Sequence, residues 1–376
     1  MRKLTIRNIG PLKMADIELG RINVIIGPQS SGKSCVLKIA CYCTWVEKKI
    51  ELAQSAEEFL KNNFFINELT RFHKLDGYFR KDSYIAYESD FMRFSYNADE
   101  GLFQFDWKEK RWEYRRPKVS YIPSERNMVA AIPNWFDVKL NNDNIQNFMA
   151  DWDRARKTCT KNMNILNLGV AYRFDNNTTL ALTNTSSGLQ SLIPLYIYLE
   201  YIGNLPSEPD EKQSYSNIQI GEDFLRTMYQ ELFVKTGKTK SESHPAKMSS
   251  NGKVEVSASI TFGKIGPYIM QFSNKEYADE CKMIYERYIK TNHVEIFLEE
   301  PENNLFPPTQ SRLVHWLQEL TQGDHGANLF IATHSPYVMT SCLEKEPRDF
   351  KLFFERKDAH YSTVVWASDE DVRERY

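Results

Sequence analysis

The sequence contains no apolar run of about 18 residues, the length that a membrane-spanning helix needs. Its first residues, MRKLTIRNIG, alternate polar and apolar types and carry charge from the second position, so we expect no secretory signal. The six cysteines include no C-x-x-C pair, and without such a signal reduced thiols are the simplest interpretation. We therefore expect a cytoplasmic protein with no membrane partner.

The chain also lacks an excess of charge of either sign. Its 48 basic and 50 acidic residues give a formal net charge of -2, which provides no general attraction to nucleic acid or to an anionic membrane. No internal repeat and no sustained heptad pattern are present. Of the 376 residues, 41% are hydrophobic and 26% are charged, as in a folded globular protein with one large α/β domain or two smaller ones.

Apolar strands alternate with helices along the sequence. Residues 3–9 and 14–19 indicate a hairpin, and the apolar run 21–26 precedes a helix that begins at Lys33. The aromatic-rich segment 78–121 predicts a meander of antiparallel strands. Further strands are expected as a pair within 166–182 and at 254–262, 294–298, 328–333, 352–356 and 362–366. Further helices are expected at 142–161, 187–201, 276–290 and 309–320.

One segment departs from this alternation. Residues 205–253 are dense in Ser, Lys, Glu, Asn and Pro, which predicts a polar, partly mobile insertion with a short helix at 224–233. The remaining elements predict an α/β fold with a mainly parallel core sheet flanked by helices plus an antiparallel β-rich lobe.

A phosphate-binding motif lies between the third strand and the helix that follows it. Residues 27–34, GPQSSGKS, fit G-x-x-x-x-G-K-[ST] at every fixed position. The glycines let backbone N–H groups surround phosphates, the lysine neutralises the β and γ oxygens, and the last hydroxyl binds Mg²⁺. A glycine-rich turn that only caps a helix is the alternative. The residues expected to bind ATP here are Gly27, Pro28, Gln29, Ser30, Ser31, Gly32, Lys33, Ser34 and Cys35, with Ser34 also a metal ligand.

Adjacent carboxylates follow a buried strand further along the chain, in the segment 294–302 (VEIFLEEPE). Ligands of open α/β sheets bind at this end of the strands. Glu299 is expected to hold Mg²⁺ through water, and Glu300 to orient or deprotonate the attacking water. The alternative is a solvated junction between a strand and a loop.

Two further segments supply candidate residues. His334 directly follows the strand 328–333, where an imidazole could donate to the γ-phosphate. The segment 184–191, NTSSGLQS, opens a helix and has the form of an N-cap, with exposed N–H groups available to an anion. Because one phosphate cradle is already assigned, this second one implies a second ligand or a second subunit.

These four segments, in this order, resemble the ABC-type ATPase heads of the SMC, RecF and OLD-like group, including compact ATPases such as the PtuA type of Septu anti-phage systems. The resemblance implies an ABC-type head over 1–376, with an N-terminal lobe over 1–130 and a C-terminal lobe over 131–376. It also implies that 186–190 is the signature segment, so that Ser187, Gly188 and Gln190 bind the partner subunit's ATP. Glu302–Leu305 would be the D-loop, and His334 the switch histidine.

The resemblance implies a mechanism in which two copies close around Mg-ATP and reopen on hydrolysis. We expect neither a long coiled coil nor a TOPRIM domain, so that nuclease action would require another polypeptide. Two functions remain open. The first is a motor or timer that acts on DNA in repair or anti-phage defence, supported by the basic and aromatic segment 107–118, which has a solvated hairpin as its alternative. The second is a nucleotide-sensing scaffold that holds a separate effector such as a nuclease. A small-molecule P-loop kinase is a third, disfavoured class.

Overall fold

A computed structural model describes most of the chain. The described residues are 2–132, 137, 139, 141–159, 171–173, 179–207, 215–239, 242–243, 247–248, 254–255, 258–259, 261–323, 326–344, 349–357 and 361–367. None of the helices in these ranges combines the length and the apolar character needed to cross a membrane.

Eleven strands form one continuous sheet in the order β6-β5-β4-β1-β2-β19-β18-β3-β17-β16-β7. Its strands are β1 (Arg2–Ile9), β2 (Leu12–Leu19), β3 (Ile22–Ile26), β4 (Phe79–Glu88), β5 (Met92–Asn97), β6 (Leu102–Trp107), β7 (Pro117–Ile122), β16 (His293–Glu299), β17 (Asn328–Thr333), β18 (Phe350–Lys357) and β19 (Ser362–Trp366). The strands from β18 to β7 are parallel to one another, whereas β2, β1, β4, β5 and β6 pair antiparallel. The expected fold class is therefore confirmed.

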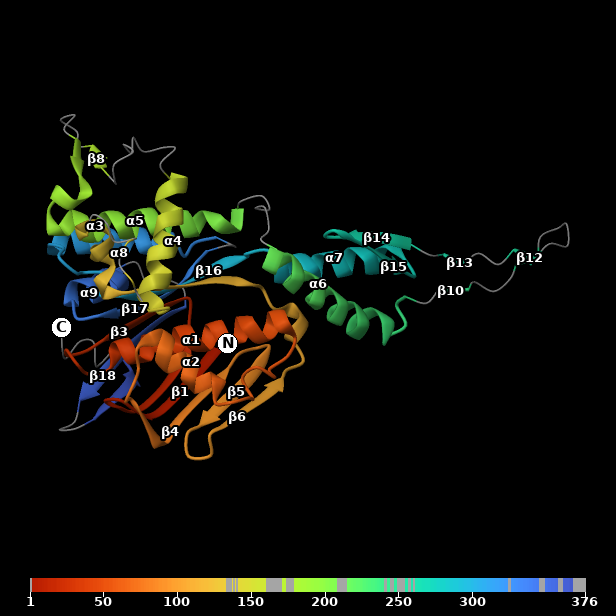
Figure 1. The fold of residues 1–376 in the computed structure, drawn as a ribbon, viewed down its shortest axis with the longest axis horizontal. Helices are drawn as coiled ribbons and strands as arrows, with labels where there is room; N and C mark the ends of the chain where they lie inside the picture. The colour runs from red at the N-terminus through yellow and green to blue at the C-terminus, as the bar shows by residue number, and fades with distance from the viewer. Residues whose placement is uncertain are drawn as a thin grey trace.

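Helices cover both faces of the parallel half of the sheet (Figure 1). They are α1 (Lys33–Ala53), α3 (Met128–Ala131), α4 (Asn144–Cys159), α5 (Ser187–Asn204), α8 (Pro307–Glu319) and α9 (Pro336–Glu344). The helix α2 (Phe64–His73) instead packs on the antiparallel strands β5 and β6. Alternate residues of a strand point to opposite faces. Accordingly Phe297 packs with the α1 side chains, whereas its neighbours Ile296 and Leu298 pack in a second core with α4, α5 and α8. Burial on both faces explains the continuous apolar runs of β3, β16 and β17.

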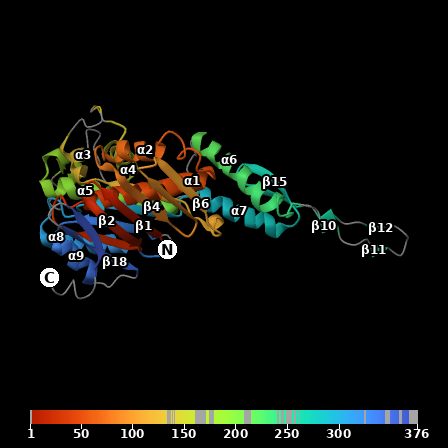
Figure 2. The same ribbon diagram turned by 90° about the horizontal axis from the view of Figure 1, so that it is seen from below.

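A narrow arm projects from this body (Figures 1 and 2). It contains α6 (Tyr215–Tyr229), a π-helical turn (Gln230–Val234), α7 (Lys275–Ile289) and the hairpin β14 (Thr261–Ile265) and β15 (Tyr268–Phe272). A third apolar cluster, which includes Phe224, Phe233, Phe272 and Tyr288, holds these elements together. The remaining strand pairs are short: β8 (Ala171–Arg173) with β9 (Thr179–Ala181), β10 (Glu242–Ser243) with β13 (Ala258–Ser259), and β11 (Lys247–Met248) with β12 (Val254–Glu255).

Several expected elements differ from the observed ones. Strand β7 is not part of the antiparallel meander but pairs in parallel with β16, because its aromatic and β-branched pattern does not reveal strand direction. The strand expected at 254–262 is divided among β12, β13 and β14. Within the polar segment 205–253, the helix α6 begins nine residues before the expected 224, and its apolar side chains pack on α7. Residues 208–214, 240–241, 244–246 and 249–253 of that segment lie outside the described residues.

Candidate nucleotide site at the parallel strand ends

The phosphate loop joins β3 to α1 and has the backbone that its glycines predict. Gly32 has φ 120°, and a Cβ atom there would lie 2.9 Å from Leu12 and 3.0 Å from Glu355. A Cβ atom on Gly27 would lie 2.8 Å from the Glu355 side chain. Both positions therefore require glycine. Pro28, Gln29 and Ser30 are exposed, so the outer side of the loop is open to a ligand.

Lys33 is folded back over its own loop. Its Nζ atom donates to the carbonyls of Gly27 at 2.9 Å and Pro28 at 2.6 Å, and the residue is 4% exposed. Burial lowers the pKa of Lys33, while the carboxylates of Glu355 and Glu300 oppose that shift. A triphosphate would offer this ammonium stronger, charge-assisted partners than carbonyl oxygens.

His334 connects the phosphate loop to the carboxylate segment. Its Nδ1 atom lies 3.1 Å from Lys33 Nζ and 3.1 Å from the carbonyl of Gly27. Its Nε2 atom lies 3.3 Å from Glu300 Oε1. The tautomer with a proton on Nε2 fits best, because Nδ1 can then accept from the lysine while Nε2 donates to the carboxylate. Lys33, His334 and Glu300 thus form one connected line, although they come from three elements distant in the sequence.

The backbone at the end of β16 is held in an uncommon conformation. Glu300 has φ 41°, in the left-handed region that non-glycine residues rarely adopt. Arg126, which is 1% exposed, donates to the carbonyls of Glu299 at 2.9 Å, Glu300 at 2.8 Å and Pro301 at 3.3 Å. This guanidinium fixes the direction in which both carboxylates leave the strand.

Glu302 holds the loop that carries His334. Its Oε1 atom accepts from the Thr333 hydroxyl at 2.8 Å and from the backbone N–H groups of His334 at 2.7 Å and Ser335 at 3.2 Å. The carboxylate of Glu302, two residues after Glu300, is therefore a positioning group for the histidine. Glu355 lies under the phosphate loop, where it accepts from the Ser31 hydroxyl.

The residues expected to bind Mg²⁺ have a suitable donor set. Glu299 is 5% exposed, its Oε2 atom accepts from the Ser124 N–H at 3.2 Å, and its Oε1 atom is buried without a hydrogen-bond partner among the described residues. Ser34 is partly exposed at the start of α1. The described residues contain no cluster of three metal-ligating side chains. This composition fits Mg²⁺, which typically takes one or two protein oxygens and completes its shell with phosphate and water.

The proposed signature segment lies apart from the chain's own phosphate loop. The Ser186 hydroxyl caps α5 by accepting from the Leu189 N–H at 3.4 Å, and Ser187 is exposed at the first turn. A Cβ atom on Gly188 would lie 3.1 Å from the carbonyl of Asn304, and Gln190 Nε2 bonds to carbonyls before the helix, at 3.0 Å for Thr183. Gln190 therefore stabilises the loop. In the described part of the chain, no hydrogen bond or ion pair joins Ser187 or Gly188 to residues 27–34.

Cys35 can contribute to the phosphate cradle only through its backbone. The thiol is 3% exposed, and burial raises its pKa to about 12. Of the expected site residues, the structure thus brings together those of the loop, the carboxylate pair and the histidine. Sequence reasoning missed Arg126 and Glu355 as site residues, and it placed Glu302 only in the expected D-loop, without the contacts to the His334 loop.

The basic segment 107–118 is largely engaged within the chain. The Arg111 guanidinium lies 4.8 Å from the Trp107 ring and 4.5 Å from the Trp112 ring. Lys108 pairs with Glu88 at 2.6 Å and Lys118 with Asp151 at 2.6 Å, while Arg116 donates to the carbonyl of Ile289 at 2.6 Å. These contacts favour a structural role for the segment.

Comparison with known proteins gives only distant structural likenesses. No family model and no curated protein matches the chain. The SMC head domain from Thermotoga maritima aligns over 97% of this chain and 98% of its own, with 12% identity and a TM-score of 0.41. The recombination mediator protein RecF in its ATPrS form covers 97% of each chain, with 11% identity and a TM-score of 0.31. An Smc head with a coiled coil and joint, derived from Pyrococcus yayanosii, covers 100% of this chain and 99% of its own, with 12% identity and a TM-score of 0.31. Scores this low carry no conclusion about function, which has to be argued from the site itself.

Proposed function

We propose that the protein binds and hydrolyses ATP at the phosphate loop. The observation that carries this proposal is the connected line of Lys33, His334 and Glu300 at the open side of a loop with the G-x-x-x-x-G-K-S sequence. The loop amides and Lys33 would hold the β and γ phosphates. Glu300 would accept a hydrogen bond or proton from the attacking water, and His334 would turn its Nε2 proton from Glu300 to the γ-phosphate.

Mg²⁺, when bound, would neutralise charge on the β and γ phosphate oxygens. Ser34 and the free oxygen of Glu299 are the groups that would hold it. The fixed backbone around Arg126 supports this assignment, because electrostatic catalysis depends on groups that need no rearrangement during reaction.

We further propose that the working form is a dimer with ATP at the interface. The first turn of α5 supports this proposal. Ser187 is exposed there, and the helix N-terminus offers N–H groups to an anion. The nucleotide held by the phosphate loop of a second copy would be that anion. A two-fold arrangement would place Ser187 and Gly188 of each copy against the γ-phosphate held by the other. The assignment to the OLD-like or PtuA type and the division into lobes near residue 130 stay predictions.

Nucleotide binding tests the first proposal. Titration calorimetry with Mg-ATP should give binding for the unmodified chain and none for Lys33→Ala. Lys13→Ala, which removes an exposed lysine on β2, is the matched control and should bind normally. Equal affinity of all three proteins would contradict the proposal.

Light scattering tests the dimer. Glu300→Gln should remain a monomer without nucleotide and form a dimer with ATP. Slow turnover preserves the ATP at the interface, and ligand binding stabilises the dimer by mass action. Adding Ser187→Arg should keep that variant monomeric in ATP while it still binds the nucleotide. A Glu300→Gln protein that stays monomeric in saturating ATP would rule the dimer out.

The alternative is a nucleotide-sensing scaffold that holds a separate effector such as a nuclease. Exposed apolar side chains on the arm favour it, because Phe262 is 69% exposed and Ile269 is 75% exposed on the same face of the hairpin. A scaffold would bind ATP, yet its turnover would be equally slow with and without Glu300. DNA as the partner has weaker support, since most of the segment 107–118 is engaged internally; salt-sensitive, ATP-dependent DNA binding would restore it.

A further inference from the structure

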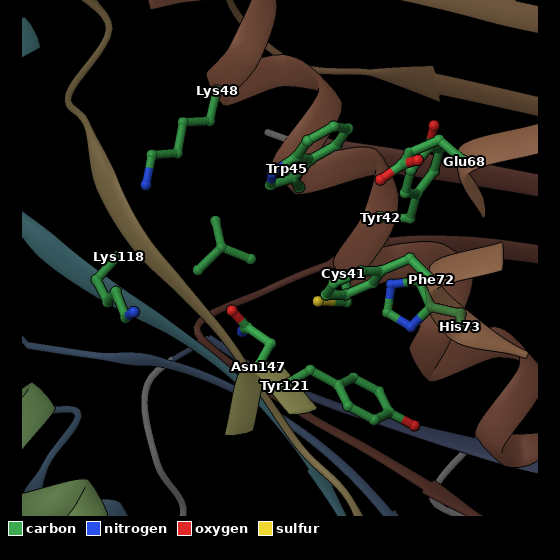
Figure 3. A pocket seen from close by; sticks show the side chains of 11 residues that line it. Cys41, Tyr42, Trp45, Lys48, Glu68, Phe72, His73, Lys118, Tyr121 and Asn147 are labelled. Atoms are coloured by element: carbon green, nitrogen blue, oxygen red, sulfur yellow. The ribbon is translucent and has the colours of Figure 1, made fainter. Parts of the chain in front are cut away.

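A cavity of about 240 Å³ lies along α1, away from the phosphate loop (Figure 3). Its lining comes from α1, α2, β7 and α4. Cys41, Trp45 and Lys48 of α1 face it, and because an α-helix rises about 1.5 Å per residue, they lie about 12 to 22 Å along the helix from Lys33. The proposed ATPase chemistry makes no use of this cavity.

One side of the cavity is aromatic. The Tyr42 and Trp45 rings are stacked with their centroids 5.5 Å apart. His73, which is 1% exposed, packs edge-on against Tyr42 and Tyr121, and Figure 3 shows its ring directed from α2 toward Cys41. Its Nδ1 atom has no hydrogen-bond partner among the described residues, and burial lowers its pKa to about 3, so the imidazole is neutral. The aromatic side thus offers a flat surface and an unused polar atom.

Two lysines line the opposite side. Figure 3 shows the ammonium groups of Lys48 and Lys118 on one side of the cavity and Glu68 on the other. Lys118 is paired with Asp151, whereas in the part of the chain that the structure describes the half-buried Lys48 makes neither a hydrogen bond nor an ion pair. Burial, together with the neighbouring charges of Arg116 and Lys118, lowers the pKa of Lys48.

The acidic lining residue does not cancel this charge. Both oxygens of Glu68 are held by Arg71, at 3.1 Å from Nε and 2.5 Å from Nη2. Lys48 therefore has no acidic partner in the described lining of the cavity, and an anion bound beside it would favour its protonated form.

We propose that this cavity binds a small anion with a planar aromatic ring, its charged group at Lys48 and Lys118 and its ring against Trp45 and Tyr42. The apolar walls and few polar groups are those of ligand sites in general. Aromatic carboxylates and mononucleotides share this chemistry, so the experiment tests each of these two classes separately.

The test measures binding by calorimetry to the full chain carrying Lys33→Ala, which prevents a contribution from the phosphate loop. The carboxylate comparison pairs indole-3-acetate with the uncharged indole-3-acetamide, and the phosphate comparison pairs AMP with adenosine. In at least one comparison the anion should bind with a Kd of about 1 mM or tighter, as expected of a fragment-sized ligand, and about tenfold more tightly than its neutral analogue. Absence of binding by both anions, or equal affinity for anion and neutral analogue in both comparisons, would overturn the proposal.

Two variants locate the binding. Lys48→Met removes the ammonium but keeps the length of the side chain, and it should weaken the anion about tenfold without affecting the neutral analogue. Asn147→Trp fills the cavity from an exposed position on α4, so it should abolish binding without unfolding the chain. Lys61→Met, at an exposed residue outside the cavity, should change nothing. Unaltered binding in Asn147→Trp, with its thermal transition intact, would place the ligand elsewhere and refute the assignment.

Discussion

The two halves of the eleven-stranded sheet differ in what their strand ends carry. In the parallel half, β3, β16 and β17 end at one edge with Ile26, Glu299 and Thr333, so the phosphate loop, the carboxylates and His334 converge there. In the antiparallel half, strand ends alternate between the two edges, and its buried face carries aromatic rings such as Phe94 and Phe103 under α1 and α2. Parallel order therefore gathers polar groups into a site, whereas antiparallel order supplies a rigid apolar support for α1.

The strongest test of this comparison is Glu300→Gln at the parallel edge. We expect the ATP hydrolysis rate to fall by about 10²–10⁴-fold, the usual contribution of a positioned base, with little change in ATP affinity. A phosphate-release assay measures the rate. Glu319→Gln, an exposed glutamate at the end of α8, is the control. A rate reduced less than twofold would remove Glu300 from the mechanism.

The antiparallel half should respond in stability instead of chemistry. Phe65 of α2 is 0% exposed and lies 5.1 Å from the Phe103 ring and 5.3 Å from the Tyr96 ring. Phe65→Ala should lower the free energy of unfolding by about 3–5 kcal/mol, measured by urea denaturation, and leave the turnover of the folded fraction unchanged. Phe65→Leu should cost less than half as much. A specific loss of turnover in Phe65→Ala would show that the two halves are not separable.

At the opposite end of the parallel strands lies a buried ion pair that has no part in the proposed reaction, and it sharpens the contrast. Glu295 Oε1 is bound by Arg2 at 2.9 Å and by Asn328 at 2.7 Å. Burial is the largest single influence and by itself would raise the pKa of Glu295, but the Arg2 charge, the charge and hydrogen bond of His293 and the hydrogen bond from Asn328 together outweigh it and lower the pKa to about 2.

A carboxylate with a depressed folded pKa stabilises the fold above its unfolded pKa, near 4.5, and this stabilisation is lost as the pH falls toward 2. The shift corresponds to about 3 kcal/mol. Glu295→Gln should therefore lower stability at pH 7 by roughly that amount and by progressively less between pH 4.5 and pH 2, measured by urea denaturation across that range. A difference that does not change with pH would refute the assigned pKa.

The smallest expected effect is at Glu355, whose carboxylate lies beneath the phosphate loop. Its negative charge opposes a triphosphate at close range, so Glu355→Gln should tighten ATP binding by about fivefold, equivalent to about 1 kcal/mol of screened repulsion. Calorimetry measures the change, and Glu344→Gln on α9 is the control. Weaker binding in Glu355→Gln would mean that the carboxylate supports the shape of the loop more than it repels phosphate.

The sequence predicts the parts of the site that local signals encode. The spacing of the glycines, lysine and serine at 27–34 is specific to phosphate-binding loops. Parallel strands bring the ends of 22–26, 293–299 and 328–333 to one edge of the sheet. Arg126 was beyond such reasoning, because it acts on backbone carbonyls that lie 173 residues and more away in the chain. The sequence also predicted too short a helix in the arm. The apolar residues of α6 are separated by polar ones, and their role becomes clear only from their packing against α7.

The bonds from Arg126 end on main-chain carbonyls, which every residue type possesses. These three bonds consequently do not depend on which side chains stand at 299 and 300, so a Glu to Gln exchange at either position leaves them in place. The guanidinium itself has no substitute among the other side chains, since five donors in a rigid fork are unique to arginine.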